Sequence, residues 1–485
     1  MVEVATRATG PILTDAPTPE PGRLRRRWRG MWPMLVVIGL YLACAVVAYW
    51  HAWPDPTSRV VAPNASDPER MIWFLAWIPF SLIHAQDPLL TTWANAPYGV
   101  NVLADTSQPL LGLMAAPVTM LFGPIASFNA LLTLAFVASA TAGYALSRRF
   151  TTWRPAAFVG GLVYGFSPYM VGQGAVGHLN LVFVPLPPLI FLVIHDLVVR
   201  QRGRPALLGC ALGLLLVAQF FISTEILAGS VIVAVGAICV LAILNWRSVH
   251  DKLQFAAVGL GVAAVLSAAL LAYPVWFTLE GPQHIVGPIQ AHPQQFRSDL
   301  VAPLVADSLQ KLAPAWLGRI RARFDSGNIA EDGSYLGGPL LVVLTIGVVI
   351  LWRRRIVRLA AIMALIAFVL SLGARLVVLG TPDIDAASGR LIPEAIFGHV
   401  PLLKNSQPSR FSLYATLFVS VLLAVILDEL WHRLRRRPWR TPRARRVFTD
   451  AACALVSLIA LAPLLPAWPY AIGAAATPRT SPPTA

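Results

Sequence analysis

Acidic side chains are the residues best placed to do chemistry, because many of them lie in segments between long apolar runs. Asp67 comes between Ser66 and Pro68, at the beginning of an aromatic-rich stretch. A carboxylate held there can act as a general base that removes a proton from a hydroxyl group. The same position suits a helix cap, in which the carboxylate only accepts backbone N–H groups. Asp105 has two similar interpretations: it assists Asp67, or it caps the next helix.

Two further ionisable groups lie in short polar turns. His178 ends the glycine-rich segment 172–178 and is followed by Asn180. An imidazole in such a turn binds phosphate or relays a proton, or it simply terminates a helix at the membrane interface. Glu225 follows a Ser-Thr pair between two apolar runs, where an ionisable group usually faces a cavity or a partner. We expect the side chains of Asp67, His178 and Glu225 to contribute to one site.

The segment 328–337 has a composition suited to binding a sugar. It contains Glu331, Asp332 and Tyr335 together with glycines. Carboxylates accept hydrogen bonds from sugar hydroxyls, and an aromatic ring covers an apolar sugar face. A solvated loop has the same composition, so the segment is equally consistent with a surface connection.

The segment 401–411 places two cations, Lys404 and Arg410, just before an apolar run. These charges can neutralise a phosphate group, and the arginine offers a bidentate fork of donors. Anchoring to anionic lipid headgroups is the alternative. The sequence contains no Walker A loop, no HExxH and no Gly-x-Ser-x-Gly motif, so it offers no signature of those catalytic classes.

The elements that must position these residues are membrane-spanning helices. The chain has 485 residues, of which 56% are hydrophobic and 13% are charged, whereas soluble domains carry about 25% charged residues. Apolar runs recur from Met31 to Tyr470, and about 11 of them (range about 10–13) are long enough to cross a hydrocarbon core roughly 30 Å thick. The runs lack the alternation of a barrel strand. We therefore predict an all-α polytopic membrane protein.

Basic clusters between the runs predict the orientation. The net charge of +15 comes from Lys and Arg in short groups, which is the positive-inside pattern and argues against a nucleic-acid partner. The amino terminus is then cytoplasmic, and the main outer segments are 51–124, 276–335 and 380–408. The predicted spans are residues 31–50, 125–146, 156–170, 180–198, 205–222, 226–244, 254–275, 336–351, 358–379, 409–428 and 449–467.

We expect one transmembrane domain over 31–470, with disordered tails at 1–30 and 471–485. Within the first outer segment, the Trp-rich stretch after Asp67 predicts a helix lying in the membrane interface. The apolar segment 109–124 predicts a second interfacial or re-entrant helix. The four cysteines show no metal or disulfide spacing, and we interpret them as small core residues.

In their order along the chain, several short motifs resemble the GT-C superfamily of integral-membrane glycosyltransferases, in particular its bacterial YfhO-like branches. The motifs span most of residues 30–430. They are Asp67 with Trp73-Phe74-Leu75-Ala76-Trp77, Tyr98-Gly99-Val100-Asn101, Gly177-His178-Leu179-Asn180, Tyr335-Leu336-Gly337 and Pro408-Ser409-Arg410-Phe411.

This resemblance implies a GT-C-like fold and a glycosyltransferase in the bacterial cytoplasmic membrane, with its site at the outer face. The implied donor is a polyprenyl-phosphate-linked sugar in the bilayer, and the acceptor is a hydroxyl of a glycan or lipid. Asp67 matches the catalytic base of the family, and the leading hypothesis is an inverting transfer. The loop has Asp67-Pro68-Glu69 in place of an Asp-x-Asp motif, so a divalent metal is possible but not indicated.

Two other functions are consistent with the sequence. A flippase or other transporter would move a lipid-linked sugar without covalent chemistry, and a scaffold would have no reactive site. For the transferase, the predicted catalytic residues are Asp67, Asp105 and Glu225. The predicted substrate-binding residues are His178, Asn180, Glu331, Asp332, Tyr335, Lys404 and Arg410.

Overall fold

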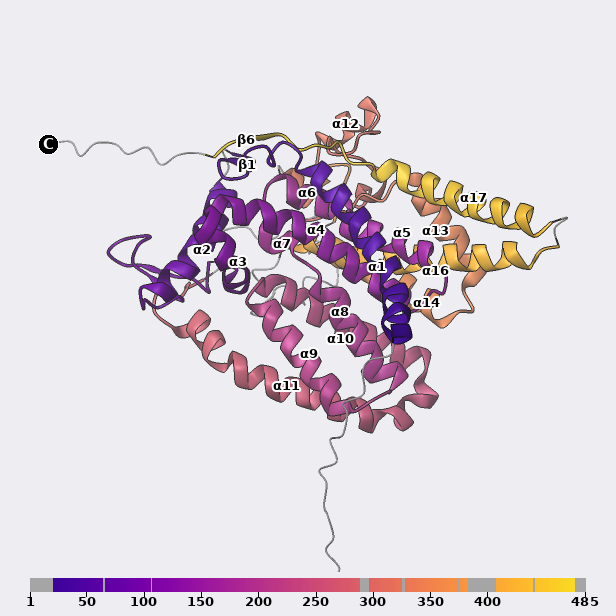
Figure 1. The fold of residues 1–485 in the computed structure, drawn as a ribbon, viewed down its shortest axis with the longest axis horizontal. Coiled ribbons are helices and arrows are strands. Elements are labelled where there is room, and N and C mark those ends of the chain that lie inside the picture. The colour runs from indigo at the N-terminus through magenta and orange to yellow at the C-terminus, as the bar shows by residue number, and fades with distance from the viewer. Residues whose placement is uncertain are drawn as a thin grey trace, which may run out of the picture.

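The protein is a bundle of α-helices whose short strands lie outside the long helices (Figure 1). The computed structural model describes residues 21–63, 66–105, 107–287, 296–324, 328–373, 376–382, 407–438 and 441–475. The helices are α1 Pro21–Ala48, α2 Ser66–Ile83, α3 Pro109–Phe122, α4 Pro124–Arg148, α5 Arg154–Gly165, α6 Pro168–Ala175, α7 Leu179–Val182, α8 Leu186–His195, α9 Pro205–Phe220, α10 Thr224–Leu244, α11 Val249–Glu280, α12 Ala315–Arg321, α13 Gly338–Leu351, α14 Arg355–Ser371, α16 Ser412–Arg436 and α17 Pro442–Leu461.

Shorter elements connect these helices. The 3-10 and π turns are η1 Asp196–Arg200, η2 Trp246–Ser248, η4 Ala302–Leu304, η5 Ile329–Glu331, η6 Pro408–Phe411 and η7 Ala462–Leu464. The strands form antiparallel pairs: β1 Arg59–Val61 with β6 Ile472–Ala474, β2 Leu90–Thr91 with β3 Val100–Asn101, and β4 Val377–Val378 with β5 Thr381–Pro382.

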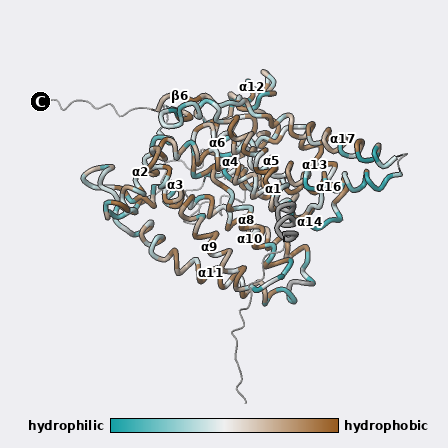
Figure 2. Tube along the Cα trace, in the orientation of Figure 1, coloured by the Kyte–Doolittle hydropathy of each residue, from teal (hydrophilic) through white to brown (hydrophobic). Residues whose placement is uncertain are grey.

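Several helices are long and apolar enough to cross a bilayer, which confirms the predicted all-α polytopic membrane class. Six described helices meet this criterion: Pro124–Arg148, Leu179–Arg200, Thr224–Leu244, His250–Glu280, Pro408–Arg436 and Pro442–Leu464. Shorter apolar helices cover Trp32–Ala48, Pro109–Phe122, Pro205–Phe220 and Gly338–Leu351. Apolar residues run along the helices, and hydrophilic residues gather around the α16–α17 turn (Figure 2). The number of spans stays a prediction.

Helix α16 is the centre of the bundle. The most apolar part of this helix is fully enclosed by protein, whereas the corresponding parts of α10, α11 and α17 are mostly exposed and suited to lipid. It packs against α4, α5, α13, α14 and α17. Near its end, the carboxylate of Asp428 accepts the backbone N–H groups of Thr152 at 2.9 Å and Trp153 at 2.7 Å. This carboxylate of α16 therefore fixes the two residues that lead into α5.

The predicted span 156–170 is wrong as a single helix. Helix α5 ends at Gly165 and α6 begins at Pro168. Proline has no N–H and suits the first turn of a new helix, and the Ser167 hydroxyl accepts the Met170 N–H at 3.3 Å. The new helix continues to Ala175, so part of the predicted glycine-rich turn is helical.

The predicted span 358–379 is too long at its end. Helix α14 stops at Ser371, and Gly373 follows with φ of 70°. A glycine in the left-handed region is a common helix terminator, because it has no Cβ to clash there. The next residues form β4, at Val377–Val378, instead of more helix.

The ends of several other elements differ from the prediction. Helix α1 begins at Pro21, inside the predicted tail 1–30, and β6 lies inside the predicted tail 471–485. Helix α16 continues to Arg436 and α17 begins at Pro442. Much of the segment between the predicted spans 409–428 and 449–467 is therefore helical, because arginine is a good helix former.

The segment 51–124 contains the two predicted short helices, α2 and α3, which pack against each other. At 14 residues, α3 is ~21 Å long at the helical rise, which is short for a full crossing. The β2–β3 pair lies between them in sequence. Strand β1 pairs with β6, so residues 472–474 lie against the segment 51–124 (Figure 1).

Close packing of α5 generates a stability prediction. A Cβ on Gly161 would lie 2.1 Å from the Tyr41 hydroxyl and 2.6 Å from the Ala140 carbonyl oxygen, whereas a Cβ on Gly261 would meet nothing within 4 Å. We expect Gly161→Ala to cost about 1–3 kcal/mol through overpacking. The matched Gly261→Ala should be neutral or slightly stabilising. Thermal unfolding in detergent measures both, and equal midpoints would contradict the packing.

Candidate functional site

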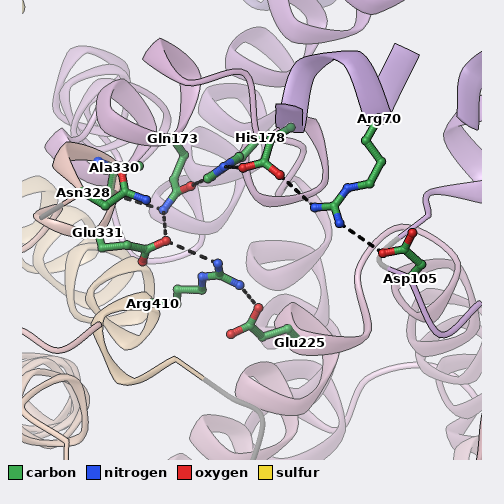
Figure 3. Close-up of polar contacts among 10 residues, drawn as sticks. Arg70, Asp105, Gln173, His178, Glu225, Asn328, Ala330, Glu331 and Arg410 are labelled. Atoms are coloured by element: carbon green, nitrogen blue, oxygen red, sulfur yellow. Dashed lines mark hydrogen bonds and ion pairs between the residues drawn. The ribbon is translucent and has the colours of Figure 1, made fainter. Parts of the chain in front are cut away.

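One end of the bundle holds a continuous chain of hydrogen bonds and ion pairs (Figure 3). Each member comes from the end of a helix or from a loop beside one, because the helix interiors here are apolar. The members, in the order of contact, are Asp105, Arg70, Asp67, His178, Gln173, Glu331, Arg410 and Glu225. We call this set the polar chain. It joins residues that are as much as 343 positions apart in the sequence, since Asp67 and Arg410 both belong to it.

Asp67 is at the accessible end of the polar chain. Its Oδ1 accepts from Arg70 Nη2 at 2.8 Å, and its Oδ2 lies 2.9 Å from His178 Nε2. Arg70 also donates to Asp105 Oδ1 at 3.1 Å, so one guanidinium bridges the two predicted acids. In the described residues, no hydrogen bond joins the Asp67 carboxylate to a backbone N–H of α2. The side chain is 39% exposed, so a substrate can approach it.

Gln173 accepts a hydrogen bond from one ring nitrogen of His178. Its Nε2 donates to the Ala330 carbonyl oxygen at 3.0 Å, which turns its Oε1 toward His178 Nδ1 at 2.5 Å. An amide oxygen only accepts, so Nδ1 must donate. The other ring nitrogen faces Asp67 Oδ2. The His178 ring is therefore held between Gln173 and Asp67 by one hydrogen bond on each side.

The buried end of the polar chain consists of Arg410 between two carboxylates. Its Nη2 lies 3.3 Å from Glu331 Oε1, and its Nη1 donates to Glu225. Glu331 is 2% exposed and also accepts from the Ser409 hydroxyl at 2.7 Å. Glu225 accepts the backbone N–H of Gln407 at 3.0 Å. Buried charges are stable only when paired in this way, so the arrangement fixes η5, η6 and α10 to each other.

Burial and pairing separate the acids of this end into two groups. The His178 hydrogen bond is the main cause that lowers the pKa of the Asp67 carboxyl, against the opposing effect of burial. Burial raises the pKa of Asp105, although Arg70 opposes this, and burial also raises the pKa of Glu331. Among these three carboxyls, Asp67 is therefore the one most favoured to be ionised.

Four predicted site residues do not join the polar chain. Asn180 is buried and its Oδ1 has no hydrogen-bond partner in the described residues. Asp332 forms an ion pair with Arg321 of α12 instead. Tyr335 is buried, and no hydrogen bond joins it to the polar chain in the described residues. Lys404 lies outside the described residues.

Sequence reasoning missed Arg70, Gln173 and Ser409. Arg70 had a detectable signal, because it lies three positions after Asp67 on a predicted helix, where opposite charges interact. Gln173 and Ser409 carried no such signal, since their partner Glu331 is 158 and 78 residues away. The described residues contain no group of three or more His, Cys, Asp or Glu side chains arranged to hold a metal ion.

The sequence matches a family model over residues 36–386, described as "Domain of unknown function (DUF6311)". The chain belongs to the DUF6311 family. No protein with a curated function matches this DUF6311 chain. The match does not identify the YfhO-like branch, which stays a prediction.

Two solved structures are similar to this DUF6311 chain. One is the archaeal oligosaccharyltransferase AglB from Archaeoglobus fulgidus, in complex with an inhibitory peptide and a dolichol-phosphate (TM-score 0.43, 13% identity, 90% of this chain and 55% of that chain). The other is the arabinofuranosyltransferase AftD from mycobacteria (TM-score 0.44, 13% identity, 91% of this chain and 27% of that chain). The DUF6311 chain thus spans about half of the first protein and about a quarter of the second.

The His178 contact generates a titration prediction. Because it lowers the pKa of Asp67, His178→Ala should raise that pKa toward the ordinary value of about 3.9. The stabilisation from this contact is present above the ordinary value and is lost as the pH falls through the lower, folded-state pKa. Infrared titration of the carboxyl band, with Asp67→Asn subtracted, measures the shift. The matched change of the exposed His84 to Ala should leave the pKa unchanged, and a shift no larger than in that control would contradict the contact.

Arg410 generates a second stability prediction. Arg410→Met leaves the Glu331 carboxylate buried without its cation, and breaking a buried pair costs about 3–5 kcal/mol. Adding Glu331→Gln should recover part of the loss, since the remaining buried group is then neutral. Arg319→Met, at an exposed position of α12, is the control. Thermal unfolding in detergent is the measurement, and a similar effect of Arg410→Met and Arg319→Met would exclude the buried pair.

Proposed function

We propose that this protein is a membrane glycosyltransferase that moves a sugar from a polyprenyl-phosphate donor to an acceptor hydroxyl. The observation that carries the proposal is the polar chain itself. It connects an accessible, ionised carboxylate at Asp67 to a buried guanidinium at Arg410 through hydrogen-bonded side chains. Such a site offers a base for a hydroxyl and cations for a phosphate within one end of a membrane bundle.

In the proposed reaction, Asp67 accepts the proton of the acceptor hydroxyl as the oxygen attacks the anomeric carbon. The bond between that carbon and the phosphate oxygen breaks, and the polyprenyl phosphate leaves with the electron pair. Both Asp67 oxygens have partners in the structure, but a carboxylate has about four lone-pair sites. Each oxygen therefore has capacity for a further hydrogen bond. A single displacement of this kind inverts the anomeric carbon.

The cations of the polar chain suit a leaving phosphate. Arg70 contacts one oxygen of the Asp67 carboxylate, and His178 Nε2 contacts the other. Arg410 lies between Glu225 and Glu331, so phosphate binding requires it to exchange one carboxylate contact for a phosphate oxygen. We propose that Glu225 is the carboxylate exchanged, because it is more exposed than Glu331. Lys404 stays a predicted phosphate ligand.

The distribution of charge supports an outer-face location for this site. The other ends of the helices hold basic residues, among them Arg149, Arg354 and Arg433, which pair with local acids. Basic residues at one end of a bundle favour the cytoplasmic side for that end. We therefore propose that the polar chain faces the outer side of the bacterial cytoplasmic membrane, where a lipid-linked donor and a glycan or lipid acceptor meet.

The test compares a substitution that removes the base with a control substitution at a nearby acidic residue of α2. Asp67→Asn keeps the shape of the side chain but removes the proton acceptor, and we expect transfer to fall by roughly 100-fold or more. Glu69→Gln, two residues along α2, should retain activity within about twofold because Glu69 lies outside the polar chain. Purified protein in liposomes is assayed for sugar transfer from a panel of polyprenyl-phosphate hexoses and pentoses to a mixed glycan and lipid acceptor pool.

The outcomes separate three conclusions. Loss of transfer in Asp67→Asn but not in Glu69→Gln supports the base. Wild-type transfer in both variants would exclude Asp67 as the base while retaining a transferase. Movement of the unaltered lipid-linked sugar across the liposome, with no covalent product from the wild-type protein, would contradict the proposed reaction and support a transporter.

A further inference from the structure

A second feature lies at the opposite end of α10 from the polar chain. A cavity of about 450 Å³ opens between η1, the end of α10 and the beginnings of α11 and α14. Its volume falls within the roughly 300–1,000 Å³ range of small-molecule sites. Glu225 is at the first turn of α10 and Asn245, which lines the cavity, follows its last turn. Twenty residues of helix separate them by ~30 Å, so the two features are on different sides of the apolar region.

The rim of this cavity is cationic. Lys252, near the beginning of α11, and Arg355, at the beginning of α14, both line it. The Lys252 ammonium donates to the Val199 carbonyl oxygen at 2.7 Å, which holds it at the rim. In the part of the chain that the structure describes, neither cation has a carboxylate partner. The nearby Asp196 of η1 is already paired with Arg149 and Arg200.

Below the rim the walls are apolar. The lining residues deeper in the bundle are aliphatic: Val198, Ile238, Leu241, Leu260, Ile356 and Leu359. Lys252 and Leu260 are eight residues apart on α11, so the apolar wall extends ~12 Å from the rim along the helix axis. A small free anion would make no favourable contact with these apolar walls. A neutral apolar molecule would make no ion pair with Lys252 or Arg355. The cavity matches a molecule with an anionic head and an alkyl chain.

We propose that this cavity binds an anionic phospholipid of the surrounding bilayer. Its phosphate lies between Lys252 and Arg355, and one acyl chain lies along the aliphatic walls toward Leu260. Basic pockets between membrane helices are general sites for anionic headgroups. Among the four elements that form the cavity, α11 packs against η1 and α10 packs against α14. A bound lipid would therefore fill the space between α11 and α14.

The experiment titrates delipidated full-length protein with phosphatidylglycerol or phosphatidylcholine and counts bound lipid by native mass spectrometry. We expect the wild-type protein to prefer phosphatidylglycerol by roughly 10-fold or more, from about two surface cations. The double variant Lys252→Gln/Arg355→Gln should lose that preference. The matched control Arg202→Gln/Arg204→Gln changes two exposed cations at the same end, outside the cavity, and should keep it.

A third variant tests the acyl-chain site. Ala257 lines the cavity and is exposed to it, so Ala257→Trp fills the space while leaving both cations in place. We expect at least a 10-fold loss of phosphatidylglycerol binding, with inorganic phosphate unable to compete in the wild-type protein. Equal binding of the two lipids, unchanged binding in either cavity variant, or displacement by millimolar phosphate would overturn the proposal.

Discussion

The pairing of Arg410 is the constraint on which the candidate site depends. A guanidinium just before the most enclosed helix of the bundle is stable only with carboxylate partners, because water is excluded there. Glu225 comes from the first turn of α10 and Glu331 from η5, so the pairing brings three distant segments together. Ser409 donates to Oε2 of Glu331, and Gln173 donates to Oε1, the oxygen that Arg410 also contacts. Gln173 in turn contacts His178, and His178 contacts the accessible Asp67.

The contacts of the polar chain connect the buried Arg410 pairing to the exposed end at Asp67. Gln173 contacts Glu331 on one side and His178 on the other, which fixes the orientation of its amide. That orientation makes Nδ1 of the imidazole the donor to Gln173. The hydrogen bond on the other ring nitrogen, between His178 Nε2 and Asp67 Oδ2, lowers the pKa of the Asp67 carboxyl. A continuous series of side-chain contacts thereby links the buried ion pair to the accessible Asp67 carboxylate.

The charged residues at the two ends of the bundle have different surroundings. At the polar chain, cations and carboxylates lie in direct contact and compensate each other. At the cavity beside α11 and α14, the cations face apolar walls, which suits a lipid rather than a reacting centre. Between the ends, helices such as α11 and α17 expose apolar surface. A bilayer around that surface would keep the two features on opposite sides and chemically independent.

The sequence by itself determined the class of the protein and most of its helices. Runs of about 20 apolar residues must be helical in a bilayer, because every backbone polar group needs an internal partner. It also indicated Asp67, His178, Glu225, Glu331 and Arg410, since charged residues between apolar runs are few. Only the tertiary structure decided which of these touch. Asp332 and Glu331 are adjacent in sequence, yet one pairs with Arg321 and the other with Arg410. Partner choice depends on distances between remote segments, and neither spacing nor composition encodes those distances locally.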